Sequence, residues 1–121
     1  MPTTLDSIVL FVKDVAALQQ FYTSNFSFTV VEEIANEWVL LQAGGCNIGL
    51  HKIGAGYEDV AITETNVKLV FAVDDIVALQ AQLKAQQVTI GEIKTYPNYP
   101  FLLCDGKDAE GNVFQLKQAK P

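Results

Sequence analysis

The chain has 121 residues and a formal net charge of −6, from 14 acidic and eight basic residues. Half of the residues are hydrophobic and 18% are charged, which indicates a globular domain and not a disordered chain. Lys and Arg form no cluster, so the charge pattern argues against a nucleic-acid partner.

The two cysteines, Cys46 and Cys104, have neither metal-type spacing nor a disulfide framework around them. We therefore expect two reduced, buried thiols. The apolar runs are too short to span a membrane, and the first residues, MPTTLDS, lack the apolar core of a signal peptide. These features predict a cytoplasmic protein with no membrane partner.

The first half of the chain predicts one strand, one helix and three further strands. Residues 5–12 are apolar and β-prone, and Asp14 follows at a position suited to a helix N-cap. Apolar side chains then recur at helical spacing as far as Phe26. The three further strands are predicted at residues 29–31, 37–42 and 46–52.

The second half repeats this order after a linker at residues 53–66, which contains Gly54 and Gly56 and has no clear periodicity. Asp75 is a second candidate N-cap. SIVLFVKDVAALQ at residues 7–19 and KLVFAVDDIVALQ at residues 68–80 share six identities in thirteen positions. The strands of this half are predicted at residues 67–73, 88–96, 101–104 and 113–117.

Two tandem βαβββ units predict an α+β fold. We expect a single domain over residues 1–121, with unit one at about 5–52 and unit two at about 67–118.

This plan resembles the vicinal oxygen chelate superfamily, which groups glyoxalase I, bleomycin-resistance proteins and extradiol dioxygenases. The passages that carry the resemblance are VLFVKDVAALQQFY at 9–22, VFAVDDIVALQAQL at 70–83 and DAEGNVFQL at 108–116. The last is similar to the family's DPxGN-type turn, with Ala109 in place of proline. The resemblance implies that the units form a cupped mixed sheet around a cavity, and that the protein is a homodimer.

The enzymes of this family use a divalent metal, which chelates two oxygens of the substrate and is held by His, Glu or Gln. The resemblance places the four ligand positions on Ser7, Gly49, Lys68 and Gln115. Gly49 has no side-chain donor atom, and Lys68 brings a cation to a site for a cation. We therefore predict that the metal site is lost and that no cofactor is bound.

His51, the only histidine, keeps a displaced metal site open as an alternative. It lies two residues after Gly49 in a predicted strand and therefore points to the same face. With Gln115 and Asp6 it could form a metal site. The other interpretation is a strand-end histidine near the cavity mouth or solvent.

A mostly apolar cavity with a few polar groups is typical of a small-molecule pocket. Its predicted lining is Ser7, Val9, Phe11, Asn47, Gly49, His51, Lys68, Val70 and Gln115. Trp38, Tyr57, Tyr96 and Tyr99 are candidates for its rim, and each of them could instead be core or interface packing. No catalytic residue is assigned.

We therefore predict a protein of this superfamily that binds a small molecule without the family metal. The alternative is a lyase, isomerase or dioxygenase of the same superfamily. Such an enzyme would be metal-dependent with displaced ligands, or metal-free with Lys68 as a base or electrostatic stabiliser. A third possibility is an interaction module with a vestigial cavity.

Overall fold

A computed structural model describes residues 5–54 and 67–121. The chain divides into two compact units, Met1–Ala61 and Ile62–Pro121, and each is described here by itself. Most of the predicted linker, including Tyr57, lies outside the described residues. Among the described helices, none is long and apolar enough to cross a membrane.

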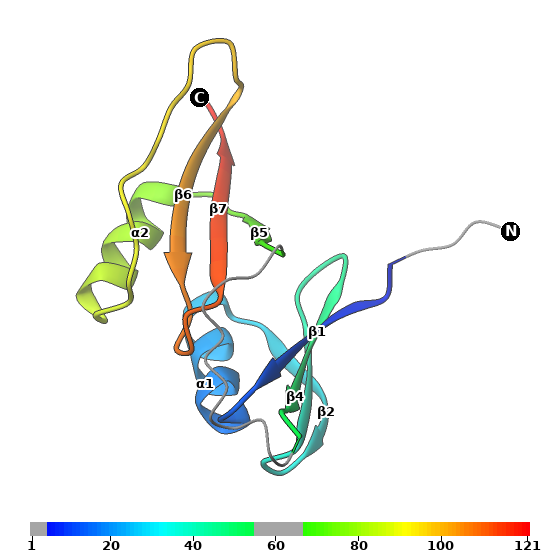
Figure 1. The fold of residues 1–121 in the computed structure, drawn as a ribbon. Coiled ribbons are helices and arrows are strands. Elements are labelled where there is room, and N and C mark those ends of the chain that lie inside the picture. Colours follow the sequence, from blue (N-terminus) through cyan, green and yellow to red (C-terminus); the bar gives the residue numbers. More distant parts are fainter. Residues whose placement is uncertain (1–4, 55–66) are drawn as a thin grey trace, which may run out of the picture. The chain divides into compact units, whose positions relative to one another are not determined.

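Unit 1 contains one helix and a four-stranded sheet (Figure 1). The strands lie in the order β1-β4-β3-β2; β1 is parallel to β4, and the other neighbours are antiparallel. The elements in chain order are β1 (Ser7–Val12), α1 (Val15–Phe26), β2 (Thr29–Ile34), β3 (Trp38–Gln42) and β4 (Asn47–Lys52). This βαβββ unit confirms the predicted order of elements.

One face of this sheet packs against α1, and the other face points away from the helix. The helix buries Val15, Leu18 and Tyr22, and the strands bury alternate residues such as Val39 and Leu41. Because successive strand residues point to opposite faces, the residues between them lie on the face away from the helix. Val9 and Phe11 lie there and are 41% and 57% exposed.

The described part of unit 2 has the order βαββ, one strand fewer than unit 1, and its three strands lie in the order β5-β7-β6 (Figure 1). β5 is parallel to β7, and β7 is antiparallel to β6. Its core includes Ile76 and Leu83 from the helix and Phe114 and Leu116 from the sheet. The elements are β5 (Leu69–Ala72), α2 (Ile76–Ala85), β6 (Phe101–Lys107) and β7 (Val113–Ala119).

Both helices begin at the predicted N-caps. The carboxylate of Asp14 accepts a hydrogen bond of 3.0 Å from the Ala17 N–H, and Asp75 accepts one of 3.0 Å from the Ala78 N–H. Each bond satisfies one of the N–H groups that have no partner within the helix. The repeated passage therefore encodes the same start of a helix in both units.

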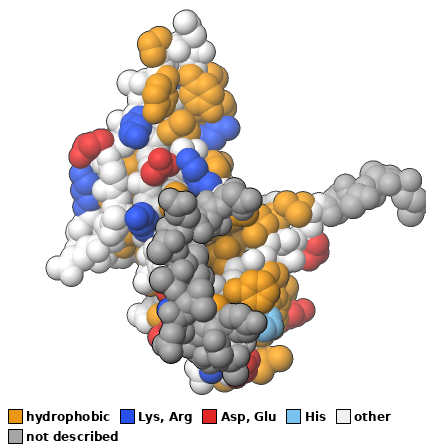
Figure 2. Space-filling view, viewed as in Figure 1, with side chains coloured by type: hydrophobic (Ala, Val, Ile, Leu, Met, Phe, Trp, Pro, Cys, Tyr) orange, Lys and Arg blue, Asp and Glu red, His pale blue; other side chains and the backbone are white. Residues whose placement is uncertain are grey.

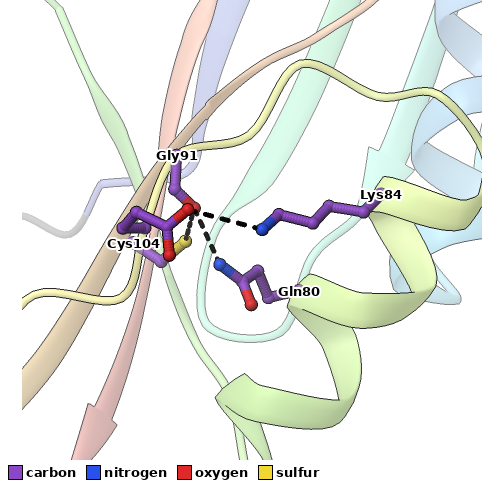
Figure 3. Close-up of polar contacts among 5 residues, drawn as sticks. Gln80, Lys84, Gly91 and Cys104 are labelled. Carbon is purple, nitrogen blue, oxygen red and sulfur yellow. Dashed lines mark hydrogen bonds and ion pairs between the residues drawn. The ribbon is translucent and has the colours of Figure 1, made fainter.

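The prediction of a regular strand at residues 88–96 is wrong. This segment precedes β6 in the chain and pairs with it only through isolated bridges, Ile90 with Gly106 and Lys94 with Leu103. The side chains of Gln80 and Cys104 donate to the Gly91 carbonyl at 2.8 and 3.3 Å (Figure 3). That carbonyl is therefore bonded to side chains and not to a neighbouring strand, which interrupts the ladder.

β6 also continues to Lys107, three residues beyond its predicted end. This longer strand brings Asp105 into the sheet, where it pairs with Gln115 of β7.

Candidate functional site

Unit 2 brings three polar side chains together on one face of its sheet. Lys68 directly precedes β5, Asp105 lies on β6, and Gln115 lies on β7 between them. The Gln115 amide nitrogen donates to Oδ1 of Asp105 at 2.9 Å. The Lys68 Nζ lies 3.6 Å from the same oxygen. We call Lys68, Asp105 and Gln115 the polar cluster.

The polar cluster is accessible to solvent and close to neutral in charge. The side chains of Lys68 and Asp105 are each 45% exposed, so water screens their attraction. The Lys68 ammonium has three N–H donors, and Asp105 can accept from only some of them. The cluster can therefore offer hydrogen-bond donors to a carbonyl or anionic oxygen. Val70, next to it on β5, is 50% exposed and adds apolar surface.

Unit 1 places its predicted site residues on neighbouring strands. Along the parallel pair β1 and β4, Ser7 lies beside Asn47, Val9 beside Gly49, and Phe11 beside His51. The rings of Phe11 and His51 have centroids 5.4 Å apart. Hydrophobic side chains reach the surface of each unit (Figure 2).

Trp38, on β3, adds its indole ring to the Phe11 and His51 rings on this face. Its ring centroid lies 6.0 Å from that of His51, its partner in the antiparallel register. Its indole N–H donates to the Glu32 carboxylate at 3.1 Å. We call Phe11, His51 and Trp38 the aromatic row.

Gly49 lies beneath the indole of Trp38. A Cβ at this position would lie 2.8 Å from Cζ3 of Trp38 and 3.2 Å from a methyl group of Val9. Real side chains almost never approach so closely, so the observed packing of Trp38 depends on glycine here.

The residues at the four family ligand positions do not fit a divalent metal. Gly49 has no donor atom, and the Lys68 ammonium has no lone pair. Gln115 offers one amide oxygen, because only its N–H is bonded to Asp105, and Ser7 supplies only a hydroxyl. Over residues 5–54 and 67–121, no group of three or more His, Cys, Asp or Glu side chains could hold a metal ion.

His51 is exposed, and its Nδ1 lies 2.7 Å from the carbonyl oxygen of Lys52. A displaced metal site would need this ring together with Asp6 and Gln115. The Gln115 side chain already contacts Asp105 in unit 2. The displaced site stays a hypothesis.

Two of the predicted rim tyrosines lie in unit 2: Tyr96 ends the irregular segment, and Tyr99 follows it. Tyr96 is 47% exposed and Tyr99 is 38% exposed. The ring of Tyr99 packs 5.7 Å from that of Phe101 at the start of β6, and the Tyr96 carbonyl accepts from Lys120 at 2.9 Å. Their role as a rim stays a prediction.

Both cysteines are free. Cys104 is buried, as predicted, whereas Cys46 is only partly buried. Burial, with a further contribution from the neighbouring Asp105 carboxylate, raises the pKa of the Cys104 thiol. Cys104 is therefore a poor nucleophile, because thiols react as thiolates.

Sequence analysis missed two acidic residues with specific partners. Asp105 was outside the predicted strand, although it follows Leu103 with the alternation of a strand. Glu32 was not among the predicted site residues, yet it accepts the indole N–H of Trp38. The position of Glu32 across the β2–β3 turn from the only tryptophan could have indicated this contact.

A family model described as the Glyoxalase/Bleomycin resistance protein/Dioxygenase superfamily matches residues 4–116. A comparison with curated protein sequences found no match.

Solved structures with a similar fold include three proteins of differently described function. A fosfomycin resistance protein, FosX, from Listeria monocytogenes has a TM-score of 0.82 and 16% identity, over 99% of this chain and 96% of that chain. A lactoylglutathione lyase from Agrobacterium tumefaciens has a TM-score of 0.73 and 17% identity, over 97% and 94%. TnmS3, an antibiotic binding protein from Streptomyces sp. CB03234, has a TM-score of 0.76 and 18% identity, over 98% of each chain. Likeness at these identities establishes a common fold.

Proposed function

The chain belongs to the Glyoxalase/Bleomycin resistance protein/Dioxygenase superfamily, and we propose that it binds a small molecule without using the family metal. The observation that carries this proposal is the polar cluster of unit 2. Both family ligand positions in that unit, Lys68 and Gln115, contact the Asp105 carboxylate. The Lys68 ammonium can donate a hydrogen bond to an oxygen of an organic ligand, but it has no lone pair with which to coordinate a cation.

The ligand proposed for this face carries a carbonyl or anionic oxygen beside an apolar part. The ammonium of Lys68 would donate to the oxygen, and Val70 would contact the apolar part. The antibiotic binding protein TnmS3 shares this fold, which supports ligand binding as a function that the fold can carry.

The proposal is tested first by metal analysis of the purified full-length protein. The protein is analysed for bound divalent metals and then titrated with nickel, zinc and ferrous ions. We expect no stoichiometric tight binding. Such binding of any of the three ions would contradict a metal-independent function.

The second step is a thermal-shift screen with a broad library of small molecules. We expect one chemical class, with a carbonyl or anionic oxygen, to raise the melting temperature. A lack of stabilisation across the library would instead favour the interaction module.

An enzyme of the same superfamily is the second candidate, because a lactoylglutathione lyase shares the fold. It would be a lyase, isomerase or dioxygenase, with displaced metal ligands or with Lys68 acting without a metal. A stoichiometric metal that is lost in the variant His51→Ala would favour the first form. Turnover of a ligand found in the screen, in the presence of a chelator, would favour the second.

We also propose that the protein is a cytoplasmic homodimer. The support is the two free thiols and the tendency of superfamily members to form oligomers. Light scattering on the eluted protein should give twice the mass of one chain, and the mass of a single chain would contradict the dimer.

A further inference from the structure

At Gly49 the neighbouring residues matter as well as the missing side chain. Gly49 lies in the middle of β4, between the buried residues Ile48 and Leu50, and is itself buried. The Cα hydrogen that occupies the Cβ position faces the side of the sheet that carries Val9 and the Trp38 indole. The volume that a side chain at this position would need is therefore filled by a neighbouring residue.

Two contacts hold the indole in that volume. On β3, Leu40 is the register partner of Gly49, and Trp38 lies two residues away on the same face. The N–H of Trp38 donates to Glu32 at 3.1 Å, and its ring packs edge-on against His51 at 6.0 Å. Glu32 from β2 and His51 from β4 thus contact the indole from the strands on either side of β3.

We propose that Trp38 closes the ligand position at residue 49. The family resemblance assigns this position to a metal ligand, and His, Glu or Gln there would have to displace the indole. Trp38 and Gly49 are then a coupled pair, in which each residue is tolerated because of the other. In unit 1 the pair replaces a coordinating side chain with the surface of the aromatic row.

A double-mutant cycle without any ligand tests this coupling, so its result does not depend on the proposed small-molecule binding. The variants are Gly49→Ala, Trp38→Leu and the double variant. In the wild-type background, Gly49→Ala should lower the melting temperature on the order of 5–10 °C, because its Cβ overlaps the indole. In the Trp38→Leu background, the same change should lower the melting temperature much less, because the 3.2 Å contact with Val9 is then the main close contact and alanine is favoured over glycine in a strand.

Gly45→Ala is the matched control. A Cβ at Gly45 meets no atom within 4 Å. This variant should change the melting temperature little, and equally in both backgrounds. Equal effects of Gly49→Ala in the two backgrounds would overturn the proposal.

Two further measurements keep the proposal falsifiable if one variant folds poorly. Trp38 is the only tryptophan, so its emission maximum reports on the indole directly. The emission maximum should shift in Gly49→Ala and stay constant in Gly45→Ala; an unchanged spectrum in a destabilised Gly49→Ala variant would count against the close contact. Tight nickel binding by Gly49→Glu with Trp38 intact would also overturn the proposal, because the position would then be open to a ligand.

Discussion

The ammonium of Lys68 lies 3.6 Å from Oδ1 of Asp105. The two residues are 37 positions apart in the chain, and the sheet of unit 2 brings them together through Gln115 on the strand between them. Lys68 occupies a position that the family resemblance assigns to a metal ligand. The Asp105 carboxylate neutralises the positive charge of Lys68. The following predictions test this pair, the helix caps and the packing that hold each unit.

Replacing Lys68 by methionine should abolish stabilisation by the ligand class found in the thermal-shift screen. The change removes the N–H donors and keeps an apolar side chain of similar length. The unliganded protein should lose less than about 1 kcal/mol, because the ion pair is exposed.

Lys84→Met is the matched control for this change. Lys84, which is labelled in Figure 3, also forms an ion pair, at 3.6 Å with Glu92. It lies on α2, away from the polar cluster. Ligand stabilisation should persist in Lys84→Met, and its persistence in Lys68→Met would exclude Lys68 from the site.

Asp105→Asn should strengthen the binding of an anionic ligand. The asparagine oxygen can still accept from Gln115, but the carboxylate no longer competes for the Lys68 ammonium. Affinity measured by calorimetry should rise and should fall more steeply with added salt than in the wild type. Glu92→Gln, which releases Lys84 in the same way, should leave both quantities unchanged.

Removing either helix cap should lower the free energy of unfolding by about 1 kcal/mol. The variants are Asp14→Ala and Asp75→Ala, each of which deletes one bond to a helix N–H. Urea denaturation measures the change. Asp74→Ala removes a neighbouring carboxylate that is not the cap of α2, and it should have a smaller effect than Asp75→Ala.

Gly106→Ala should destabilise unit 2 by about 1–3 kcal/mol. Its Cβ would lie 2.9 Å from an edge carbon of Phe114, whose side chain is fully buried. Gly91→Ala is the comparison, because its nearest atom would be at 3.6 Å, an ordinary contact. Equal losses in urea denaturation of the two variants would contradict the packing around Phe114.

The two thiols should react at different rates with a thiol-specific reagent at pH 8. Cys46 is partly exposed and should react quickly, and Cys104 should react slowly because it is buried and its pKa is raised. Cys46→Ala should remove the fast phase.

The sign of the pH effect follows from the raised pKa of Cys104. The folded state disfavours its thiolate, so its contribution to stability is present below the ordinary thiol pKa and declines as pH rises above it. Cys104→Ala should therefore lose less stability than the wild type between pH 8 and pH 10.

The local elements of this protein were predictable because their causes are local. Asp14 and Asp75 cap helices through bonds to residues three positions away, and strand alternation needs only neighbouring residues. The same alternation placed Val9, Gly49 and His51 on one face, and the register of β1 and β4 pairs them with neighbours on that face. The two tandem units followed from the repeat of these local signals, and the family followed from the resemblance that the repeated passages and DAEGNVFQL carry.

The tertiary structure decided which side chains meet across strands. The register of a strand depends on which of its faces is buried and on turn geometry, so the pairing of Asp105 with Gln115 and the approach of Lys68 required the assembled sheet of unit 2. The same reason applies in unit 1, where the β2–β3 and β3–β4 registers bring Glu32, Trp38 and Gly49 together. The sequence by itself determined the fold and the missing donor at Gly49, and only the packed sheet placed an indole where that donor would have been.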